Sequence, residues 1–438
     1  MPTRLPNVLV IGAGFAGVKV CQGLRHTPVH VALLDRNNYH LFQPLLYQVA
    51  SAALSAADIA FPIRQIFRNQ SNINIVLAEV KDIDLVRRVI RTDDMEIDYD
   101  YLVVATGATH SYFGKADEWA KYAPGLKRVE DAIEIRKRIL LAYEEADNEL
   151  DEASRRAKLT FVVVGGGPTG TELAGALREI AAEKIQEDYR TIVGSTVRVI
   201  LVEANDRIMK QFPPSLSEKA KKSLERMGVE VRNNARVTEI DDEGVCVGDE
   251  RIPAHNVFWA AGVQASPLGK CLGVELDRAG RVKVNPDCSV PGHPEAFVIG
   301  DQASLTDAKG VVVPGLAPAA MQMGKYVAKI IRQEVTAHVP VEKRQPFVYF
   351  DKGMLATIGK ARAIADIRGW KFSGFFAWVL WSVVHLMFLI SFRNKLLVMI
   401  NWIFTYIFDS KGARLITGDF HPRIKHMRDV TPETFSVS

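Results

Sequence analysis

The sequence predicts an α/β fold with two Rossmann-like dinucleotide-binding domains, because one glycine fingerprint occurs twice. The first copy, residues 12–17 (Gly-Ala-Gly-Phe-Ala-Gly), follows the apolar run of residues 8–11. The second copy, residues 165–170 (Gly-Gly-Gly-Pro-Thr-Gly), follows residues 159–164, which are mostly β-branched or aromatic. A fingerprint between a strand and a helix is typical of the strand–helix–strand unit that holds a dinucleotide. Two copies therefore indicate two bound dinucleotides.

The first domain is predicted to be discontinuous. Residues 1–120 supply the opening strand–helix–strand unit, and residues 285–335 are needed to complete its sheet. The later block contains an apolar strand that runs into Gly300 and Asp301. The predicted elements of this domain are strands at residues 7–11, 29–34, 98–104 and 296–300, and helices at residues 15–26 and 318–333.

The second domain, residues 121–284, is predicted to be inserted within the first. Residues 128–158 are highly charged and predicted to be helical, with their charges on a solvated face. Residues 336–438 form a C-terminal region, in which residues 347–358 are predicted to be a hairpin with its turn at 351–353. The other predicted elements of the second domain are strands at residues 159–164 and 196–202, a helix at residues 169–189, and short strands up to about residue 284.

An acidic residue ends the second strand of each unit. Asp35 follows Gly12 by 23 residues, close to the spacing of the acid that binds a ribose hydroxyl. Glu203 follows the strand at 196–202 and lies farther from Gly165. A carboxylate at this place repels the 2′-phosphate of NADPH. We therefore expect the second domain to prefer NADH.

Three further glycine turns support the two dinucleotide sites. Residues 101–107 end a strand in the small-residue turn Ala-Thr-Gly, and residues 258–262 end another in Ala-Ala-Gly. Gly300 and Asp301 end a third strand, and the Asp301 carboxylate suits a ribityl hydroxyl of a flavin. A simple turn-forming role is the alternative for Asp301.

Length and composition limit the number of domains and the classes of function that the chain can have. The 438 residues fit two or three domains. The net charge of +4 and the lack of a basic tract with interleaved aromatics argue against nucleic-acid binding. The first strand begins within about six residues of Met1, which predicts no signal peptide and a chain that folds on the cytoplasmic or an equivalent reducing side. We expect no metal site, no redox disulfide and inert packing for the four cysteines, Cys21, Cys246, Cys271 and Cys288.

The order of the glycine motifs resembles that of flavoproteins with two dinucleotide-binding domains. Three segments narrow the resemblance: residues 40–48 (His-Leu-Phe-Gln-Pro-Leu-Leu-Tyr-Gln), residues 166–175 (Gly-Gly-Pro-Thr-Gly-Thr-Glu-Leu-Ala-Gly) and residues 317–322 (Ala-Pro-Ala-Ala-Met-Gln). Together with the aromatic C-terminal segment, they are similar to type II NADH dehydrogenases, the single-subunit NADH:quinone oxidoreductases. The resemblance runs from about residue 7 to residue 418.

The resemblance implies an enzyme that does not pump protons. In that family FAD lies in the first domain, hydride passes to it from NADH, and two electrons then reach a membrane quinone. Glu172 is implied to lie near the nicotinamide and the quinone side of the flavin, although a helix-start carboxylate favoured by the helix dipole is an alternative. The residues implied to contact FAD are Gly12, Gly14, Phe15, Ala16, Gly17, Asp35, Arg36, Val80, Ala105, Thr106, Gly107, Gly300, Asp301, Ala317 and Pro318.

One position departs from the family pattern. The quinone-site motif is often Ala-Gln-x-Ala-x-Gln, and here Pro318 replaces its first glutamine while Gln322 fills the second position. Pro318 suits the first turn of a helix, where a missing N–H costs little. Gln322 is then the expected quinone donor. The residues implied to bind NADH in the second domain are Gly165, Gly167, Pro168, Thr169, Gly170, Glu203, Ala261 and Gly262.

The C-terminal region contains two apolar stretches within residues 370–408. Residues 372–392 hold no Asp, Glu, Lys or Arg, and about 21 helical residues could just cross a bilayer core. Residues 396–408 are too short to do so. The alternatives are a spanning helix, a buried core helix and, favoured here, helices that lie in the membrane interface. Three groups of residues favour helices in the membrane interface. They are a polar stripe (Asn394, Asn401 and Thr405), tryptophans of the kind found at membrane interfaces (Trp370, Trp378, Trp381 and Trp402) and basic residues that flank the apolar stretches (Arg368, Lys371, Arg393 and Lys395).

The resemblance also implies partners. They are a membrane quinone, a lipid surface on the cytoplasmic face of the inner or cell membrane, and a second copy of the chain in a homodimer. Two other functions stay open: reduction of a protein acceptor of the ferredoxin or rubredoxin type, and redox sensing without turnover. Sulfide:quinone oxidoreductases share the fold but need reactive cysteines at positions that Cys271 and Cys288 do not match.

Overall fold

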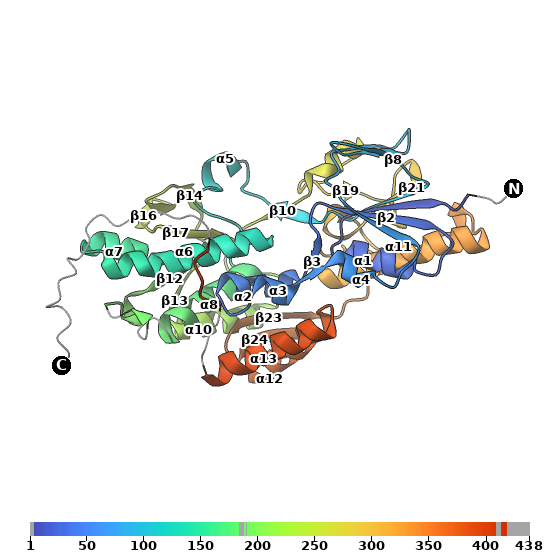
Figure 1. The fold of residues 1–438 in the computed structure, drawn as a ribbon. Helices are drawn as coiled ribbons and strands as arrows, with labels where there is room; N and C mark the ends of the chain where they lie inside the picture. Colours follow the sequence, from blue (N-terminus) through green and yellow to red (C-terminus); the bar gives the residue numbers. More distant parts are fainter. Residues whose placement is uncertain (1–3, 184–187, 190, 409–412, 418–438) are drawn as a thin grey trace. The chain divides into compact units, whose positions relative to one another are not determined.

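The computed structural model describes residues 4–183, 188–189, 191–408 and 413–417. The chain divides into two compact units, whose bounds differ from those of the predicted domains. Figure 1 shows the ribbon with its element labels. Unit 1 comprises residues 1–41, 60–110 and 263–352, and unit 2 comprises residues 42–59, 111–262 and 353–438.

Unit 1 is built on a six-stranded sheet with the order β20-β21-β9-β1-β2-β5. β1 lies inside this sheet and pairs in parallel with both β2 and β9, so its residues 8–11 are buried on both faces. β21 pairs in parallel with β9, which confirms that a distant block of sequence completes the sheet. The strands are β1 (Asn7–Ile11), β2 (His30–Asp35), β5 (Ile73–Leu77), β9 (Tyr101–Val104), β20 (Ser289–Val290) and β21 (His293–Val298).

Two helices of unit 1 start at the carboxyl edge of this sheet. α1 (Phe15–Gly23) follows β1 and packs against α11 (Ala317–Ala337) (Figure 1). The predicted helices at 15–26 and 318–333 are therefore confirmed, with shifted ends. The remaining elements are β3 (Tyr39–Leu41), β4 (Ala60–Pro62), α4 (Ile63–Ile66), β6 (Asp82–Asp84), β7 (Val89–Arg91), β8 (Glu96–Asp98), β10 (Ala108–His110), β18 (Val263–Ala265), η3 (Pro267–Leu272), β19 (Val282–Lys283), η4 (Gly300–Gln302), β22 (Ala303–Ser304) and η5 (Val341–Lys343).

Unit 2 is built on a parallel four-stranded sheet with the order β13-β12-β11-β17. β11 is buried along its whole length, as its unbroken apolar run predicts. η1, α2 and α3 belong to this unit because α2 packs against α6 and α8. The elements are η1 (Gln43–Leu45), α2 (Leu46–Ala50), α3 (Ala56–Ile59), α5 (Ala116–Trp119), α6 (Val129–Asn148), α7 (Glu152–Lys158), β11 (Thr160–Val164), α8 (Pro168–Glu183), η2 (Gly194–Thr196), β12 (Arg198–Val202), α10 (Pro214–Met227), β13 (Val229–Arg232), β14 (Val237–Ile240), β15 (Gly244–Val247), β16 (Glu250–Pro253) and β17 (Asn256–Trp259).

The charged stretch 128–158 forms α6 and α7, as predicted, but not all of its charges are solvated. Glu149 and Lys158 are each 1% exposed, and the Lys158 Nζ lies 2.8 Å from a Glu149 carboxylate oxygen. The prediction of a solvated face is wrong for this pair, which is buried at the junction of the two helices.

The predicted hairpin at 347–358 is wrong in its first strand and its turn, whereas its second strand is confirmed by β23. Residues 347–353 form no strand, because the Tyr349 N–H donates to the Asp307 carboxylate and the Phe350 N–H donates to the Gln322 side chain, each at 3.0 Å. The hairpin lies later in the chain and is extended by a third, edge strand. Its strands are β23 (Met354–Gly359), β24 (Arg362–Ile367) and β25 (Trp370–Gly374).

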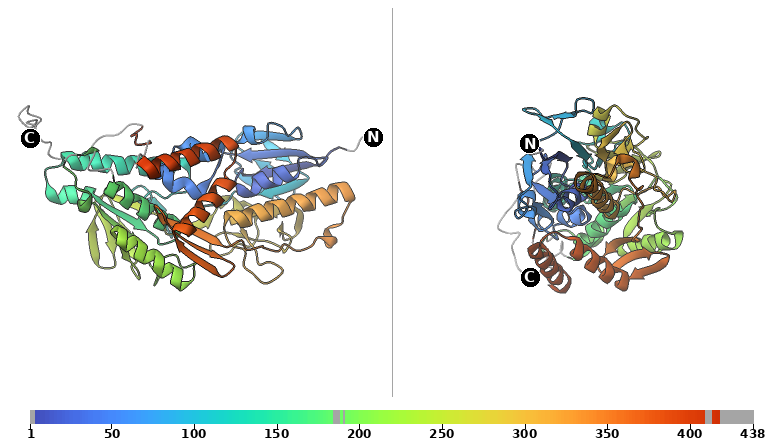
Figure 2. Two further views of the ribbon diagram at one scale, coloured as in Figure 1. Left: turned by 90° about the horizontal axis from the view of Figure 1, so that it is seen from below. Right: turned by 90° about the vertical axis from the view of Figure 1, so that its right-hand side faces the viewer.

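The apolar C-terminal stretch is not one helix. Its first residues belong to β25, and two separate helices follow, α12 (Phe375–Phe388) and α13 (Phe392–Phe408) (Figure 2). Within the part of the chain that the structure describes, no helix combines the length and the apolar character that crossing a bilayer requires.

The polar stripe of α13 faces the protein and not a headgroup layer. The Asn394 side chain donates to the backbone carbonyls of Ala57 and Asp58 at 3.3 and 3.0 Å, and Asn401 donates to the Asp58 carboxylate at 3.3 Å. Asn394 and Asn401 of the predicted stripe therefore contact α3. Two of the tryptophans predicted at an interface are also buried, because Trp381 and Trp402 are only 1% and 7% exposed.

Candidate functional site

The first fingerprint forms a tight turn whose middle glycine faces open space. Gly12 has a φ of +100°, and a side chain there would place its Cβ 2.5 Å from the Ala105 carbonyl oxygen. A Cβ at Gly17 would collide with the Gly12 carbonyl oxygen, whereas a Cβ at Gly14 would meet nothing within 4 Å. The outer glycines therefore allow the turn to form, and the middle one leaves room for an approaching phosphate.

The second fingerprint has the same construction in unit 2. Gly165 has a φ of +109°, and its Cβ would lie 2.5 Å from the Ala261 Cα. A Cβ at Gly170 would collide with the Gly165 carbonyl oxygen, and Gly167 again faces open space. Both copies thus leave room for a phosphate at the start of a helix, where backbone N–H groups lack partners and favour an anion.

The two predicted acids take equivalent positions. Asp35 accepts hydrogen bonds of 2.7 Å from the N–H groups of Ala13 and Asn37. Burial raises the pKa of Asp35, and these N–H groups partly offset that effect. Glu203 accepts 2.7 Å bonds from the N–H groups of Gly166 and Asn205. Each carboxylate is anchored at the second residue of its fingerprint, as a ribose-binding acid would be.

The other residues predicted to bind FAD gather at the same carboxyl edge of the unit 1 sheet. Residues 105–107 follow β9, and η4 follows β21 and contains Gly300 and Asp301. Pro318 lies in the first turn of α11, as predicted. Arg36 forms an ion pair with Glu79 at 3.7 Å, on the rim.

Sequence reasoning missed Gln302, which is fully buried in this region. Its amide donates to the Ser266 carbonyl at 3.1 Å and accepts from the Thr106 hydroxyl at 3.2 Å. It thereby fixes the Ala-Thr-Gly turn relative to η4. The only signal in the sequence was its place directly after Asp301. His40 also contacts this fingerprint: its Nδ1 lies 2.8 Å from the Ala13 carbonyl oxygen, and burial lowers its pKa.

Gln322 makes a two-point contact with the backbone of Phe350. Its side-chain amide donates to the Phe350 carbonyl and accepts from the Phe350 N–H, both at 3.0 Å. A donor role toward quinone would have to share or break this pair. The contact indicates that Gln322 holds the segment around Phe350 in place.

Glu172 lies on α8 beyond its first turn and carries a perturbed carboxyl group. Burial raises its pKa to about 8, although the Thr357 N–H partly offsets the effect by a hydrogen bond. A helix-start role does not explain this residue, since α8 begins at Pro168 and its first turn holds no acid. Strongly raised carboxyl pKa values cluster at functional sites, so Glu172 remains a candidate.

The cysteines follow the sequence expectation only in part. All four are free, and Cys21 and Cys288 are buried in sites where burial raises their pKa. Cys246 and Cys271 are partly exposed, and burial raises the pKa of Cys271 as well, so inert packing stays a prediction for these two. Within the described residues, no cluster of three or more His, Cys, Asp or Glu side chains could hold a metal.

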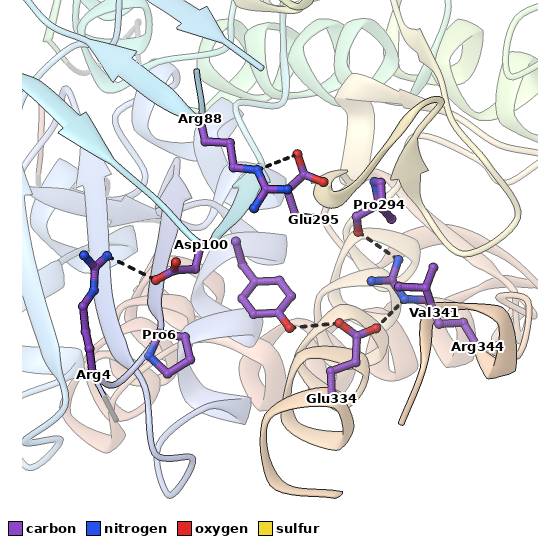
Figure 3. A pocket seen from close by; sticks show the side chains of 10 residues that line it. Arg4, Pro6, Arg88, Asp100, Pro294, Glu295, Glu334, Val341 and Arg344 are labelled. Atoms are coloured by element: carbon purple, nitrogen blue, oxygen red, sulfur yellow. Dashed lines mark hydrogen bonds and ion pairs between the residues drawn. The ribbon is translucent and has the colours of Figure 1, made fainter. Parts of the chain in front are cut away.

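A surface hollow on unit 1 lies away from the fingerprint. It has a volume of about 640 Å³ and is lined by residues at the amino ends of β1, β9 and β21, the edge opposite the glycine turns (Figure 3). Its charged groups neutralise one another: Arg4 pairs with Asp100 at 3.4 Å and Arg88 with Glu295 at 3.3 Å. It offers neither glycine turns nor free charge for a dinucleotide.

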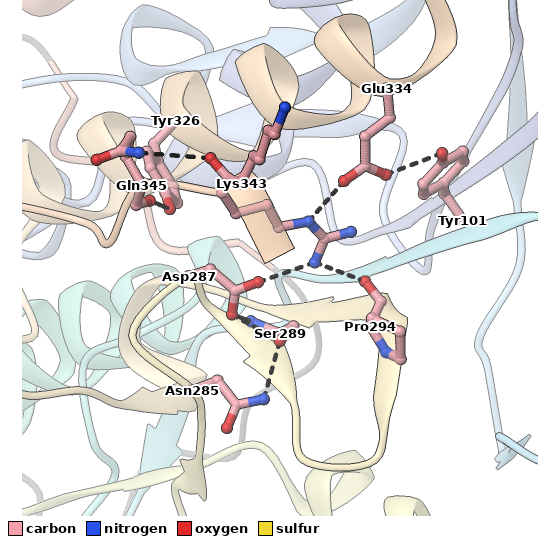
Figure 4. Close-up of polar contacts among 10 residues, drawn as sticks. Tyr101, Asn285, Asp287, Ser289, Pro294, Tyr326, Glu334, Lys343 and Gln345 are labelled. Carbon is pink, nitrogen blue, oxygen red and sulfur yellow. Dashed lines mark hydrogen bonds and ion pairs between the residues drawn. The ribbon is translucent and has the colours of Figure 1, made fainter. Parts of the chain in front are cut away.

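Arg344 lines this hollow and cross-links the chain there (Figure 3), and its partners Asp287, Pro294 and Glu334 are labelled in Figure 4. Its side chain is 4% exposed and donates to the carboxylates of Asp287 and Glu334 and to the Pro294 carbonyl, at 2.8, 2.5 and 2.9 Å. Glu334 also accepts from the Tyr101 hydroxyl at 3.0 Å. The network ties the end of α11 to β9, to β21 and to the segment before β20, so its role is structural.

Known proteins match the chain along almost its whole length. A model of the pyridine nucleotide-disulphide oxidoreductase family matches residues 6–324, and one of the NDH2 C-terminal domain matches residues 352–410. The type II NADH:quinone oxidoreductase NdhA of Mycobacterium tuberculosis is 43% identical over 425 residues, which cover 94% of this chain and 89% of the relative. Ndh of the same organism is 42% identical over 429 residues, which cover 95% and 91%.

Solved structures share the fold at lower identity. NDH2 from Plasmodium falciparum, solved in complex with NADH, matches with a TM-score of 0.85 at 20% identity, over 95% of this chain and 100% of that one. The sulfide:quinone oxidoreductase of Aquifex aeolicus matches with a TM-score of 0.71 at 18% identity, over 92% and 96%.

Two sheets that each carry a glycine fingerprint and an anchored acid define a pyridine nucleotide-dependent flavoprotein oxidoreductase. Within that class, the chain belongs to the family of type II NADH:quinone oxidoreductases. It is an FAD-dependent NADH dehydrogenase with quinone as the electron acceptor, in a family that does not pump protons. The resemblance predicted from the sequence is confirmed, and the protein-acceptor and sensor alternatives are set aside.

Proposed function

We propose that unit 1 holds FAD and unit 2 holds NADH, each on its own fingerprint. The observation that carries this assignment is the paired construction of the two turns, in which Gly14 and Gly167 both face open space and the anchored acids are Asp35 and Glu203. When bound, FAD accepts hydride from NADH and returns two electrons to quinone. The chain supplies binding, orientation and the electrostatics of both sites.

The test is an absorbance spectrum of the purified protein under anaerobic conditions. A flavin band is expected to bleach on adding one equivalent of NADH and to recover on adding a short-chain quinone. A flavin that bleaches with NADH but recovers only with a protein acceptor would contradict quinone as the oxidant. A colourless protein that takes up no FAD would contradict the assignment of unit 1.

Glu203 supports a preference for NADH over NADPH. Its two oxygens are held by backbone N–H groups, so the carboxylate is fixed where a 2′-phosphate would approach. Glu172 is proposed as the ionisable group of the catalytic region, because its raised pKa of about 8 keeps the carboxyl group mostly protonated at neutral pH. A protonated carboxyl group can donate a hydrogen bond or a proton, which quinone reduction requires.

We also propose that the chain attaches to a membrane surface through α12 and α13. Both helices expose large apolar side chains although the polar stripe of α13 is turned inward. An exposed apolar face with basic residues beside it, such as Arg393 and Lys395 of α13, suits a helix that lies in the interface. Attachment at the cytoplasmic face and a homodimer are part of this proposal, by family resemblance. The exposed side chains are Phe375, Phe376, Val379, Val383, Met387, Phe388, Phe392, Leu396, Met399, Ile400, Ile403 and Phe404.

Replacing two of these side chains should weaken vesicle binding. Phe376 and Phe392 are 81% and 80% exposed, and the double variant Phe376→Glu/Phe392→Glu puts two charges on the apolar face. Each phenylalanine contributes roughly 1.5–3 kcal/mol when buried, so binding to lipid vesicles in a flotation assay should fall more than tenfold. Val86→Glu, at an 87% exposed site on unit 1, is the matched control. Equal flotation of both variants would contradict this attachment surface.

A further inference from the structure

Phe113 combines an exposed aromatic ring with a strained backbone. Its side chain is 71% exposed, and its φ is +51°, in the left-handed region that bulky residues rarely adopt. An exposed phenylalanine contributes little to folding, and the left-handed backbone costs free energy. Strain of this kind persists where the surrounding structure enforces it, and it concentrates at functional sites.

A rigid platform enforces the conformation of Phe113. Trp259, at the end of β17, is 3% exposed, and Tyr112 stacks on it with ring centroids 5.1 Å apart. The Trp259 indole N–H donates to the Ser111 carbonyl at 2.8 Å. The Phe113 ring meets the same indole edge-on, with centroids 6.1 Å apart. The ring is thus held from below by Trp259 while most of its surface stays open.

The open ring lies beside the second fingerprint. A Cβ at Gly262 would lie 2.9 Å from the Phe113 Cζ, so the absence of a side chain there lets the ring approach the backbone. Ala261, the preceding residue, contacts Gly165 across the turn. The Ser111 N–H also donates to the Gly262 carbonyl at 3.1 Å, which fixes the two segments side by side.

The strand order places Phe113 on one half of the nucleotide. β12, which leads to Glu203, pairs with one side of β11, and β17, which leads to Gly262, pairs with the other side. The acid after β12 marks the adenosine ribose, and the pyrophosphate lies at the fingerprint after β11. The end of β17 therefore faces the nicotinamide half.

We propose that Phe113 is a binding residue for the nicotinamide half of NADH. The inference rests on the proposed binding of NADH to unit 2 and adds a residue to which the glycine motifs do not point. The ring offers apolar, stackable surface to the nicotinamide and its ribose. Because Trp259 already holds the ring before the ligand arrives, little ordering remains to be done on binding.

The test compares three variants of the FAD-loaded enzyme for binding of NAD⁺ and of ADP-ribose, which lacks the nicotinamide. Phe113→Asn removes the ring and suits the left-handed backbone, so we expect about tenfold weaker NAD⁺ binding, unchanged ADP-ribose binding and an unchanged or higher Tm. The KM of the Phe113→Asn variant for NADH should also rise. Phe113→Tyr keeps the ring and should restore NAD⁺ binding.

Gly167→Val serves as the reference that should lose both ligands. Equal NAD⁺ binding by wild type and Phe113→Asn would overturn the proposal, as would a parallel loss of both ligands or a lowered Tm, which would indicate a structural role. Failure of the wild-type protein to bind ADP-ribose would contradict the NADH site of unit 2 itself.

Discussion

Gly14→Val is expected to purify without flavin, whereas Gly167→Val is expected to keep its flavin and fail to oxidise NADH. Both glycines face open space, because a Cβ added at either position meets no protein atom within 4 Å. Neither has a positive φ, so a valine backbone is not strained at these positions. The valine methyl groups would occupy the space through which each pyrophosphate approaches the backbone N–H groups of the fingerprint. NADH:quinone activity should fall to about 1% or less in both variants, because losing even two or three charge-assisted hydrogen bonds removes several kcal/mol.

The two variants control for each other. The ratio of flavin absorbance to protein absorbance is measured on the purified proteins, and NAD⁺ binding is measured by calorimetry. Gly14→Val should still bind NAD⁺ and Gly167→Val should still carry FAD, while thermal melting shows that both are folded. Normal flavin content in Gly14→Val, or lost flavin in Gly167→Val, would contradict the assignment of FAD to unit 1 and NADH to unit 2.

Much of this site could be predicted from the sequence because its signals are local. A fully buried strand, a glycine turn and a helix are adjacent in the chain, so residues 7–23 and 160–183 contain the geometry of each turn. The acids Asp35 and Glu203 follow from the same periodicity, since Asp35 ends the next strand, β2, and Glu203 directly follows β12. Gln302 could not be predicted as a site residue because its role depends on hydrogen bonds with Ser266 and Thr106, which are distant in sequence.

The errors arise where tertiary contacts override local signals. The sequence Asp-Lys-Gly at 351–353 is a good turn signal, but the side chains of Asp307 and Gln322 hold the preceding backbone out of any ladder. The polar stripe of α13 was identified correctly as a stripe, yet periodicity does not say which face meets water. Asn394 faces inward because the backbone carbonyls of α3 need a donor there.

The buried pair of Glu149 and Lys158 could not be predicted either, and removing one of its partners should strongly destabilise unit 2. Their side chains are 0% and 2% exposed, and Glu149 also accepts hydrogen bonds from the Ser154 hydroxyl and the Asp151 N–H, at 3.0 and 3.2 Å. Lys158→Met removes the cation and leaves a buried carboxylate without its partner. The expected loss is roughly 3–5 kcal/mol of the free energy of unfolding.

The measurement is urea unfolding followed by tryptophan fluorescence, which reports on unit 2 because all six tryptophans belong to it. Lys222→Met is the matched control, since Lys222 pairs with Glu218 at 3.3 Å but both side chains are more than half exposed. Such an exposed pair contributes at most about 1 kcal/mol. Equal midpoints for the two variants would show that the buried pair does not stabilise unit 2.

The pH dependence gives the same pair a second signature. Burial alone would raise the pKa of Glu149, but the hydrogen bonds from Lys158, Asp151 and Ser154 outweigh it and hold the pKa at about 2, against an ordinary value of 4.5. A depressed carboxyl pKa stabilises the folded state above the unfolded pKa, and this contribution fades as the pH falls from about 4.5 toward 2. The variant Glu149→Leu/Lys158→Met, which removes both charges, should therefore lose less stability on acidification than the wild type. It should also be more stable than Lys158→Met, because an apolar pair leaves no buried charge uncompensated.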